Sequence, residues 1–144
     1  MKIKILKLDE NASDLIRGSE QAAGWDLSSN ESFTLPAGKS ALVKTGIAIE
    51  MPSFLYGDIK PRSKLASKYG ITILACVIDS DYRGEIMVNL HNTSNSDFEI
   101  RRGDKIAQMI IIEHYCDVDV KYVDKLRETK RGKAGINSAE LRLR

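Results

Sequence analysis

The chain has few of the residues that build disulfide scaffolds and zinc sites. Its 144 residues include only two cysteines and two histidines. Cys76 and Cys116 lie far apart in the sequence, form no C-x-x-C pair and have no histidine at zinc-ligand spacing. These features argue against both a disulfide-stapled scaffold and a zinc site.

Long apolar runs and a strong charge of one sign are also missing. The first eight residues alternate between charged and apolar side chains, unlike the apolar core of a signal peptide, and no run approaches membrane-spanning length. Twenty-two basic and twenty acidic residues leave a net charge of +2, too nearly balanced to imply a nucleic-acid surface. These absences predict a soluble protein of a reducing, cytoplasmic compartment, with no membrane or nucleic-acid partner.

Basic residues do gather near the C-terminus. They are Lys121, Lys125, Arg127, Lys130, Arg131, Lys133, Arg142 and Arg144. Such a tail either binds phosphates or is a solvated, disordered end, and the residue pattern alone fits both interpretations.

Period-two alternation of apolar residues is the recurring pattern of the chain. It is found at Ile3 and Ile5, at Ile47 and Ile49, at Ile86, Val88 and Leu90, and at Val118, Val120 and Tyr122. Turn-forming segments divide the chain into roughly eight or more short strands, the spacing of a sandwich or barrel. Hydrophobic residues make up 42% of the chain, enough for one core. We therefore predict one all-β domain, a β-sandwich or barrel over residues 1–124, followed by an arm over residues 125–144.

One short helix is predicted over residues 63–69. Ser63 stands where an N-cap is favoured, and Gly70 stands where a left-handed C-cap residue is favoured. Arg62 and Ser63 bring a guanidinium, a hydroxyl and backbone donors to the start of this segment. That combination predicts a phosphate site.

Charge is concentrated in residues 77–85, which read Val-Ile-Asp-Ser-Asp-Tyr-Arg-Gly-Glu. They follow an apolar run at residues 71–77, so a predicted strand delivers three acids, a tyrosine and an arginine to a tight turn at Gly84. This density of charge predicts a functional site. The alternative is that Asp79 or Asp81 merely pairs with Arg83 across the turn, and the nine residues alone support both interpretations equally.

Five segments in a fixed order resemble the motifs of the trimeric dUTPase family. They are Ala-Ala-Gly-Trp-Asp-Leu at 22–27, Pro-Arg-Ser-Lys-Leu-Ala at 61–66, residues 77–85, Arg-Gly-Asp-Lys-Ile-Ala-Gln at 102–108, and Arg-Gly-Lys-Ala-Gly-Ile-Asn-Ser at 131–138. Each segment alone is weak evidence, but their order and spacing cover nearly the whole chain. The resemblance implies a jelly-roll homotrimer with shared active sites, which hydrolyses dUTP to dUMP and pyrophosphate with the help of Mg²⁺.

The resemblance also implies roles for individual residues. Asp79 would activate the water that attacks the α-phosphorus, Tyr82 would exclude ribose, and Asp81 and Arg83 would form a structural ion pair. The implied uracil contacts come from the hairpin main chain at Cys76, Val77, Ile78 and Met87. The implied phosphate contacts come from Arg62, Ser63, Lys64 and Gln108. Asp26 would reach a triphosphate-bound magnesium through water.

The arm at residues 125–144 is implied to be flexible and to close over the active site. Its implied substrate contacts are Arg131, Ile136, Asn137 and Ser138. Ile136 stands where the family has a phenylalanine over the uracil, and residues 137–140 replace a Gly-Ser-Thr-Gly stretch. Because isoleucine loses the stacking of an aromatic ring, worth about 1 kcal/mol, we expect a weaker or differently shaped lid. Lys64 and Cys76 also depart from the family, which has a small residue and a glycine there.

Two other functions are compatible with these motifs. A dCTP deaminase-like enzyme of the same superfamily needs a glutamate poised at the base, and Glu85 follows the turn, beyond the expected hairpin contacts. A nucleotide-binding or partner-binding module with a degenerate arm would need no catalysis at all. Turnover of dUTP with magnesium separates the three functions.

Overall fold

The computed structural model describes residues 2–133, and this part of the chain is mostly β, as predicted. Its single α-helix, α1, spans Ser63–Tyr69. The strands are β1 (Lys4–Lys7), β2 (Ile16–Arg17), β3 (Trp25–Ser28), β4 (Phe33–Leu35), β5 (Ser40–Lys44), β6 (Ile47–Glu50), β7 (Leu55–Lys60), β8 (Ile71–Ile73), β9 (Val77–Ile78), β10 (Met87–Asn92), β11 (Phe98–Ile100) and β12 (Lys105–Glu113). Within residues 2–133 no helix is long and apolar enough to cross a membrane.

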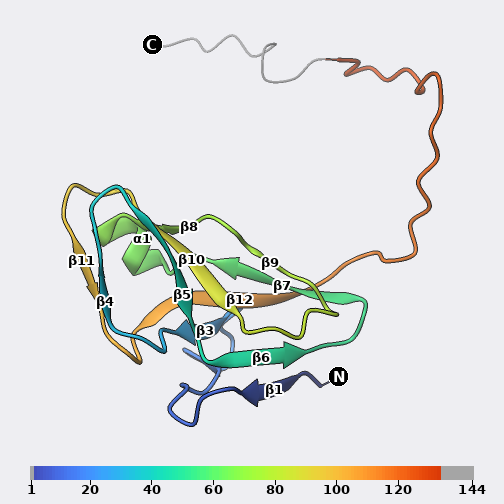
Figure 1. Cartoon of the computed structure of the whole chain (residues 1–144). Coiled ribbons are helices and arrows are strands. Elements are labelled where there is room, and N and C mark those ends of the chain that lie inside the picture. The colour runs from blue at the N-terminus through green and yellow to red at the C-terminus, as the bar shows by residue number, and fades with distance from the viewer. Residues whose placement is uncertain (1, 134–144) are drawn as a thin grey trace.

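Two sheets form the body of the domain (Figure 1). The larger has the strand order β2-β3-β12-β7-β9, and the smaller has the order β5-β10-β8. All of these pairings are antiparallel. Two further strand pairs, β1-β6 and β11-β4, lie beside them. These open sheets confirm the predicted jelly-roll-like sandwich and do not form a closed barrel in the described chain.

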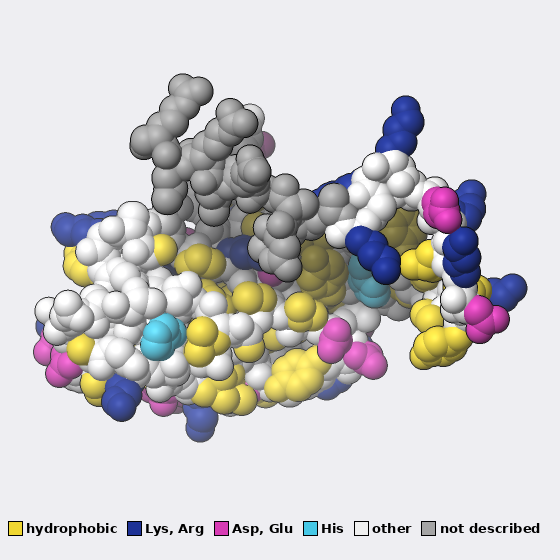
Figure 2. Space-filling model, turned by 90° about the horizontal axis from the view of Figure 1, so that it is seen from above, with side chains coloured by type: hydrophobic (Ala, Val, Ile, Leu, Met, Phe, Trp, Pro, Cys, Tyr) yellow, Lys and Arg dark blue, Asp and Glu magenta, His cyan; other side chains and the backbone are white. Residues whose placement is uncertain are grey.

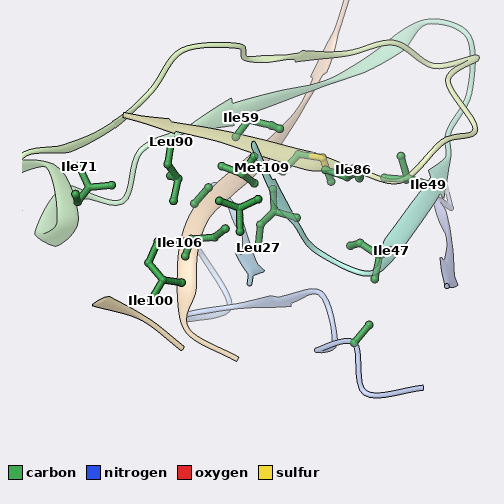
Figure 3. Packing of buried hydrophobic residues seen from close by; sticks show 14 of the residues in the cluster. Leu27, Ile47, Ile49, Ile59, Ile71, Ile86, Leu90, Ile100, Ile106 and Met109 are labelled. Atoms are coloured by element: carbon green, nitrogen blue, oxygen red, sulfur yellow. The ribbon is translucent and has the colours of Figure 1, made fainter. Parts of the chain in front are cut away.

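The hydrophobic core lies between the two sheets. Leu27, Ile59 and Met109 come from the larger sheet, Val88 and Leu90 come from the smaller one, and each is at most 1% exposed. Figure 3 shows the labelled residues of this cluster gathered between the ribbons. Burying one such side chain stabilises the fold by about 1.5–3 kcal/mol, so this cluster holds the strands that carry the site.

Helix α1 has the predicted bounds, but it begins differently from the prediction. Gly70 is the C-cap with a left-handed φ of 68°, as expected. The N-cap is Arg62, with no side-chain capping bond, and Ser63 is the first helical residue. The sequence signal for a capping serine was therefore wrong by one position.

Residues 114–133 leave the sheets after β12 and contain no strand (Figure 1). The segment is tethered at its start, where His114 N–H donates to the Phe54 carbonyl at 2.9 Å. The alternation at Val118, Val120 and Tyr122 predicted a strand, but these side chains are 65%, 79% and 95% exposed. That prediction was wrong because no neighbouring strand of the described chain pairs with the segment. In Figure 2 basic side chains follow its course at the right of the molecule.

A polar cluster around Asp9 ties three loops together. Asp9 Oδ1 accepts the Asn11 main-chain N–H at 2.8 Å, and Asp9 Oδ2 accepts Asn30 Nδ2 at 2.8 Å. Arg102 Nη2 lies 2.7 Å from the same Oδ2, and Arg102 Nε donates to the Asn30 carbonyl at 2.7 Å. The hydrogen bonds from Asn11 and Asn30, with the charge of Arg102, lower the pKa of Asp9 from 3.8 to about 2.

This lowered pKa predicts a loss of stability in acid. The cluster stabilises the fold fully above the ordinary value of 3.8, and its contribution disappears as the pH falls through the folded value of about 2. Asp9→Asn should therefore lower the melting temperature at neutral pH, and the gap from the parent should close in acid. Thermal unfolding across this pH range measures the gap, with the exposed neighbour change Glu10→Gln as the control. An equal gap at every pH would contradict the assignment.

Candidate active site

A cavity of about 810 Å³, called here the basic cavity, opens beside the start of α1. Its lining includes Asp26 of β3, Arg62, which directly precedes α1, and Lys105 and Gln108 of β12. Ser63 and Lys64 also line it and are exposed. The structure thus brings together Asp26 and all four residues predicted to contact phosphate, and it adds Lys105.

Strand pairing decides which side chains face the basic cavity. Gln108 of β12 lies opposite Asp26 of β3, and opposed residues in an antiparallel pair share a face. A bulge between Lys105 and Ala107 then shifts the register, so Lys105 lies opposite Ser28. The two residues between Lys105 and Gln108 are both buried in the core. The extra residue therefore returns Lys105 to the face that holds Asp26 and Gln108.

Asp26 holds two cations at the floor of the basic cavity. Its side chain is only 8% exposed, its Oδ1 lies 3.2 Å from Arg62 Nε, and its Oδ2 lies 2.8 Å from Lys105 Nζ. Arg62 Nη1 also donates to the Lys105 carbonyl at 3.3 Å. Two cations against one carboxylate leave the cluster with one excess positive charge. A fixed excess of positive charge at a partly desolvated site favours an anion such as phosphate.

Gln108 is held by a hydrogen bond, and its position depends on the space beside Gly24. Gln108 Nε2 donates to the Pro61 carbonyl at 3.1 Å, next to the start of α1. A Cβ added at Gly24 would lie 2.5 Å from Gln108 Oε1 and 3.0 Å from Gln108 Cβ. The amide can occupy its position only because residue 24 has no side chain.

A smaller cavity of about 200 Å³, called here the hairpin cavity, is formed by the connection from β9 to β10. It is lined by Leu42, Val77, Ile78, Asp79, Tyr82, Glu85 and Met87. All of these except Leu42 and Glu85 were predicted site residues. Glu85 was expected beyond the hairpin contacts, and its place in the lining corrects that expectation.

Asp79 begins the turn of the hairpin. Its carbonyl accepts the Tyr82 N–H at 3.2 Å, which closes the turn. The sequence predicted partial desolvation of the Asp79 carboxylate, whereas the single chain leaves Asp79 exposed. The described residues therefore do not provide the predicted desolvation of this carboxylate.

Arg83 supports the turn through the main chain. Its Nη1 donates to the Ser80 carbonyl at 2.7 Å and to the Tyr82 carbonyl at 3.1 Å. The ion pair expected between Arg83 and Asp81 is not formed. Neither Asp79 nor Asp81 therefore forms an ion pair with Arg83.

The base of the hairpin is fixed to the turn between β5 and β6. Glu85 Oε1 accepts the Gly46 N–H at 2.8 Å, and Thr45 Oγ1 donates to the Ile86 carbonyl at 2.6 Å. Ile86 N–H donates to the Ile47 carbonyl at 2.8 Å. These three bonds set the position of the strand that carries Met87.

The two arms of the hairpin belong to different sheets. Strand β9 pairs with β7 in the larger sheet, while β10 pairs with β5 and β8 in the smaller one. Since β9 and β10 form no ladder with each other in the described chain, main-chain groups of residues 76–78 and 87 are not used up by mutual pairing. The Cys76 carbonyl does accept the Ile59 N–H at 2.7 Å, and Cys76 lies in neither cavity lining.

The basic cavity and the hairpin cavity have no lining residue in common. Asp79 and Tyr82 therefore face one space, while Arg62 and Gln108 face another. The described chain therefore presents two separate cavities. Of the predicted arm residues, Arg131 is described and exposed, while Ile136, Asn137 and Ser138 lie outside the described residues.

The described residues contain no metal site of their own. Within residues 2–133, no group of three or more His, Cys, Asp or Glu residues could hold a metal ion. Asp26 is the predicted residue nearest to such a role, and both of its oxygens face cations. Cys76 and Cys116 are both free thiols.

Comparison with known proteins identifies the family. The dUTPase family model matches residues 10–140. The chain belongs to the dUTPase family. It is 50% identical over 134 residues to the deoxyuridine 5'-triphosphate nucleotidohydrolase of Paramecium bursaria Chlorella virus 1, covering 93% of this chain and 94% of that one. It is 43% identical over 138 residues to the mitochondrial human enzyme, covering 96% of this chain and 54% of that one.

Solved dUTPases share the fold. A mutant dUTPase of Staphylococcus bacteriophage 80alpha in complex with dUpNHpp aligns with a TM-score of 0.89 at 23% identity, covering 95% of this chain and 97% of that one. A mutant dUTPase of phage phi11 of S. aureus, described with a structural Mg(II) ion, aligns with a TM-score of 0.82 at 24% identity, covering 89% of this chain and all of that one. The predicted jelly-roll architecture and the predicted dUTPase resemblance are thereby confirmed.

Lys105, Leu42 and Glu85 are among the lining residues of the two cavities that the sequence did not predict. Lys105 was missed because strict alternation from Gln108 places it on the opposite face of the strand. Leu42 lies in β5, far from every motif, and only sheet pairing brings it to the hairpin cavity. Glu85 could have been predicted, because it belongs to the charged segment 77–85, but its hydrogen bond to Gly46 depends on tertiary structure.

Proposed function

We propose that this protein hydrolyses dUTP to dUMP and pyrophosphate, with Asp79 as the base that activates the attacking water. The observation that carries the proposal is that Asp79 lines one small cavity together with Tyr82, Val77 and Ile78, in a chain of the dUTPase family. A carboxylate that lines a cavity can orient water toward a phosphate bound beside it.

The proposed step needs a proton acceptor and cations on the phosphates. The water oxygen attacks the α-phosphorus, the bond from that phosphorus to the bridging oxygen breaks, and pyrophosphate leaves. Asp79 takes the proton that the water loses. Arg62 and Lys105 offset the negative charge of the phosphates, and Gln108 donates its amide to them.

Uracil recognition is proposed to use the main chain of the hairpin. Within the described chain, β9 has a strand partner only in β7, and Met87 of β10 has one only in β5. The N–H and C=O groups that point away from these partners are available to the polar edge of the base. Val77, Ile78 and Met87 supply main-chain atoms, so their apolar side chains are compatible with this role. Cys76 contributes least, since its carbonyl already accepts the Ile59 N–H.

Magnesium fits the site as an ion carried by the substrate. Mg²⁺ usually keeps several waters and binds through one or two carboxylates together with substrate phosphates. Asp26 supplies one carboxylate beside the proposed phosphate position, which suits a contact through water. When bound, the ion would neutralise charge on the triphosphate oxygens.

A turnover assay tests the proposed function. The purified chain with magnesium should release pyrophosphate from dUTP much faster than from dCTP, dTTP or UTP. Deamination of dCTP would favour the deaminase-like function. Tight binding of dUTP without turnover would favour the nucleotide-binding module.

We also propose that the active form is a homotrimer, because the basic cavity and the hairpin cavity are separate within one chain. By the family resemblance, each site would combine Arg62, Ser63 and Gln108 of one chain, Asp79 of a second and the arm of a third. Mass measurement in solution should give three times the chain mass of 16.1 kDa. A fully active monomer at micromolar concentration would contradict the shared site.

A change at Gly24, which is not itself a proposed substrate contact, should weaken phosphate binding by displacing Gln108. Gly24→Ala would push Gln108 off the Pro61 carbonyl, because the new Cβ would approach Gln108 Cβ to 3.0 Å. We expect KM for dUTP to rise about tenfold or more, the cost of losing one hydrogen bond to a charged group. Gln108→Ala should have a similar effect, and combining the two changes should add little. Additive losses would mean that Gly24 acts through another contact.

A further inference from the structure

We propose that Gly84 is a positioning residue for sugar specificity, because its missing side chain lets the Tyr82 ring fold back over the turn. The inference rests on the proposed hydrolysis of dUTP and on the role that the family resemblance implies for Tyr82, the exclusion of ribose. It assigns to Gly84 an effect on substrate choice that is transmitted only through Tyr82.

The Tyr82 ring occupies the space that a side chain at residue 84 would need. A Cβ added at Gly84 would lie 2.6 Å from Tyr82 Cζ and 2.9 Å from Tyr82 Cε2, with the hydroxyl oxygen closer still. Atoms that are not bonded do not approach so closely. The observed ring position is therefore available only to a chain with glycine at residue 84.

The folded-back ring is held by a hydrogen bond at its far end. The Tyr82 hydroxyl donates to the Glu85 carbonyl at 3.0 Å. Residue 85 is itself fixed, because its carboxylate accepts the Gly46 N–H at 2.8 Å. The hydroxyl thus docks on a rigid part of the hairpin, and the ring forms one wall of the hairpin cavity beside Asp79.

An alanine at residue 84 would move the ring and leave the backbone in place. Gly84 is not among the glycines with positive φ, so its backbone conformation is open to alanine. The atoms that clash are the far end of the Tyr82 side chain, which is 40% exposed and can swing toward solvent. Gly84→Ala therefore changes one wall of the cavity while the fold is preserved.

Five proteins test the inference: the parent, Gly84→Ala, Tyr82→Ala, the double variant and Tyr82→Phe. For each, kcat/KM is measured with dUTP and with UTP, and the melting temperature is recorded. Gly84→Ala should reduce the preference for dUTP over UTP about tenfold or more, because exclusion of the ribose hydroxyl depends on the position of the Tyr82 ring. The double variant should show the same preference as Tyr82→Ala alone. Tyr82→Phe, which keeps the ring and loses its hydrogen bond, should retain most of the preference.

Three results would overturn the inference. They are an unchanged dUTP preference in Gly84→Ala, an equal effect of the alanine when Tyr82 is already absent, and an unfolded Gly84→Ala protein, which would mean that the backbone yields before the ring. Failure of the proposed function is distinguishable from all three. In that case the parent itself would not hydrolyse dUTP.

Discussion

Replacement of Asp79 by asparagine should nearly abolish dUTP hydrolysis while leaving the fold and dUTP binding intact. The amide has almost the shape of the carboxylate but cannot accept a proton from water at neutral pH. Loss of a positioned general base typically lowers the rate by roughly a hundred- to ten-thousand-fold. Because Asp79 is exposed and its turn is closed by main-chain bonds, the change should not disturb packing. Steady-state turnover and equilibrium binding of dUTP measure the two effects separately.

Asp81 provides a matched control for this experiment. It is an exposed acid in the same turn, and it is outside the lining of the hairpin cavity. Asp81→Asn should retain parental turnover within a few-fold. Hydrolysis by the Asp79 variant at a similar rate would mean that another group activates the water.

Truncation before Thr129 should remove most turnover and spare both assembly and melting temperature. Residues 129–133, the described part of the removed segment, are exposed, and none belongs to the hydrophobic core, so their loss removes no buried contact. The family resemblance implies that the removed segment would cover the bound triphosphate. Ordering it costs roughly 1 kcal/mol or more per residue in backbone entropy, which the phosphates would have to offset. Kinetics, solution mass and thermal unfolding of the truncated chain give the three readouts.

A single substitution in the arm complements the truncation. Ile136→Phe restores the aromatic residue that the family has over the uracil, and stacking is worth about 1 kcal/mol, or about fivefold in affinity. Tighter dUTP binding is expected if the arm closes over the base. If removal of the arm changes neither rate nor affinity, the arm has no part in catalysis. A role of the arm in binding a protein partner would then be favoured.

Local signals in the sequence were sufficient for the helix of the site but not for the strand before the charged turn. The bounds of α1 follow from a glycine at the C-cap and an apolar run after it. That apolar run, residues 71–77, was predicted as one strand, and this was wrong, because it divides into β8 and β9, which pair in different sheets. The strand predicted at Val118 to Tyr122 was wrong for a physical reason. Alternation indicates which residues share a face, but a strand also needs a partner, and the described chain provides none.

Tertiary features of the site were beyond the reach of sequence patterns. Lys105 reaches Asp26 only because one extra residue interrupts the alternation of β12, and such a bulge has no clear signature in the residues 105–107. The exposure of Asp79 and the separation of the two cavities depend on which strands pair in which sheet. The family resemblance predicted the roles of the residues, and the structure shows where those residues lie.

The separation of the basic cavity from the hairpin cavity has a genetic consequence under the proposed trimer. Chains with a lesion in one half-site still carry an intact copy of the other half. A mixed population, in which some chains lack the Asp79 carboxylate and others lack the Gln108 amide, would therefore assemble some complete sites although neither kind of chain forms one alone. Conversely, a single damaged chain in an otherwise intact assembly would impair the sites to which it contributes. Damaging alleles of this protein would therefore be dominant negative over intact alleles.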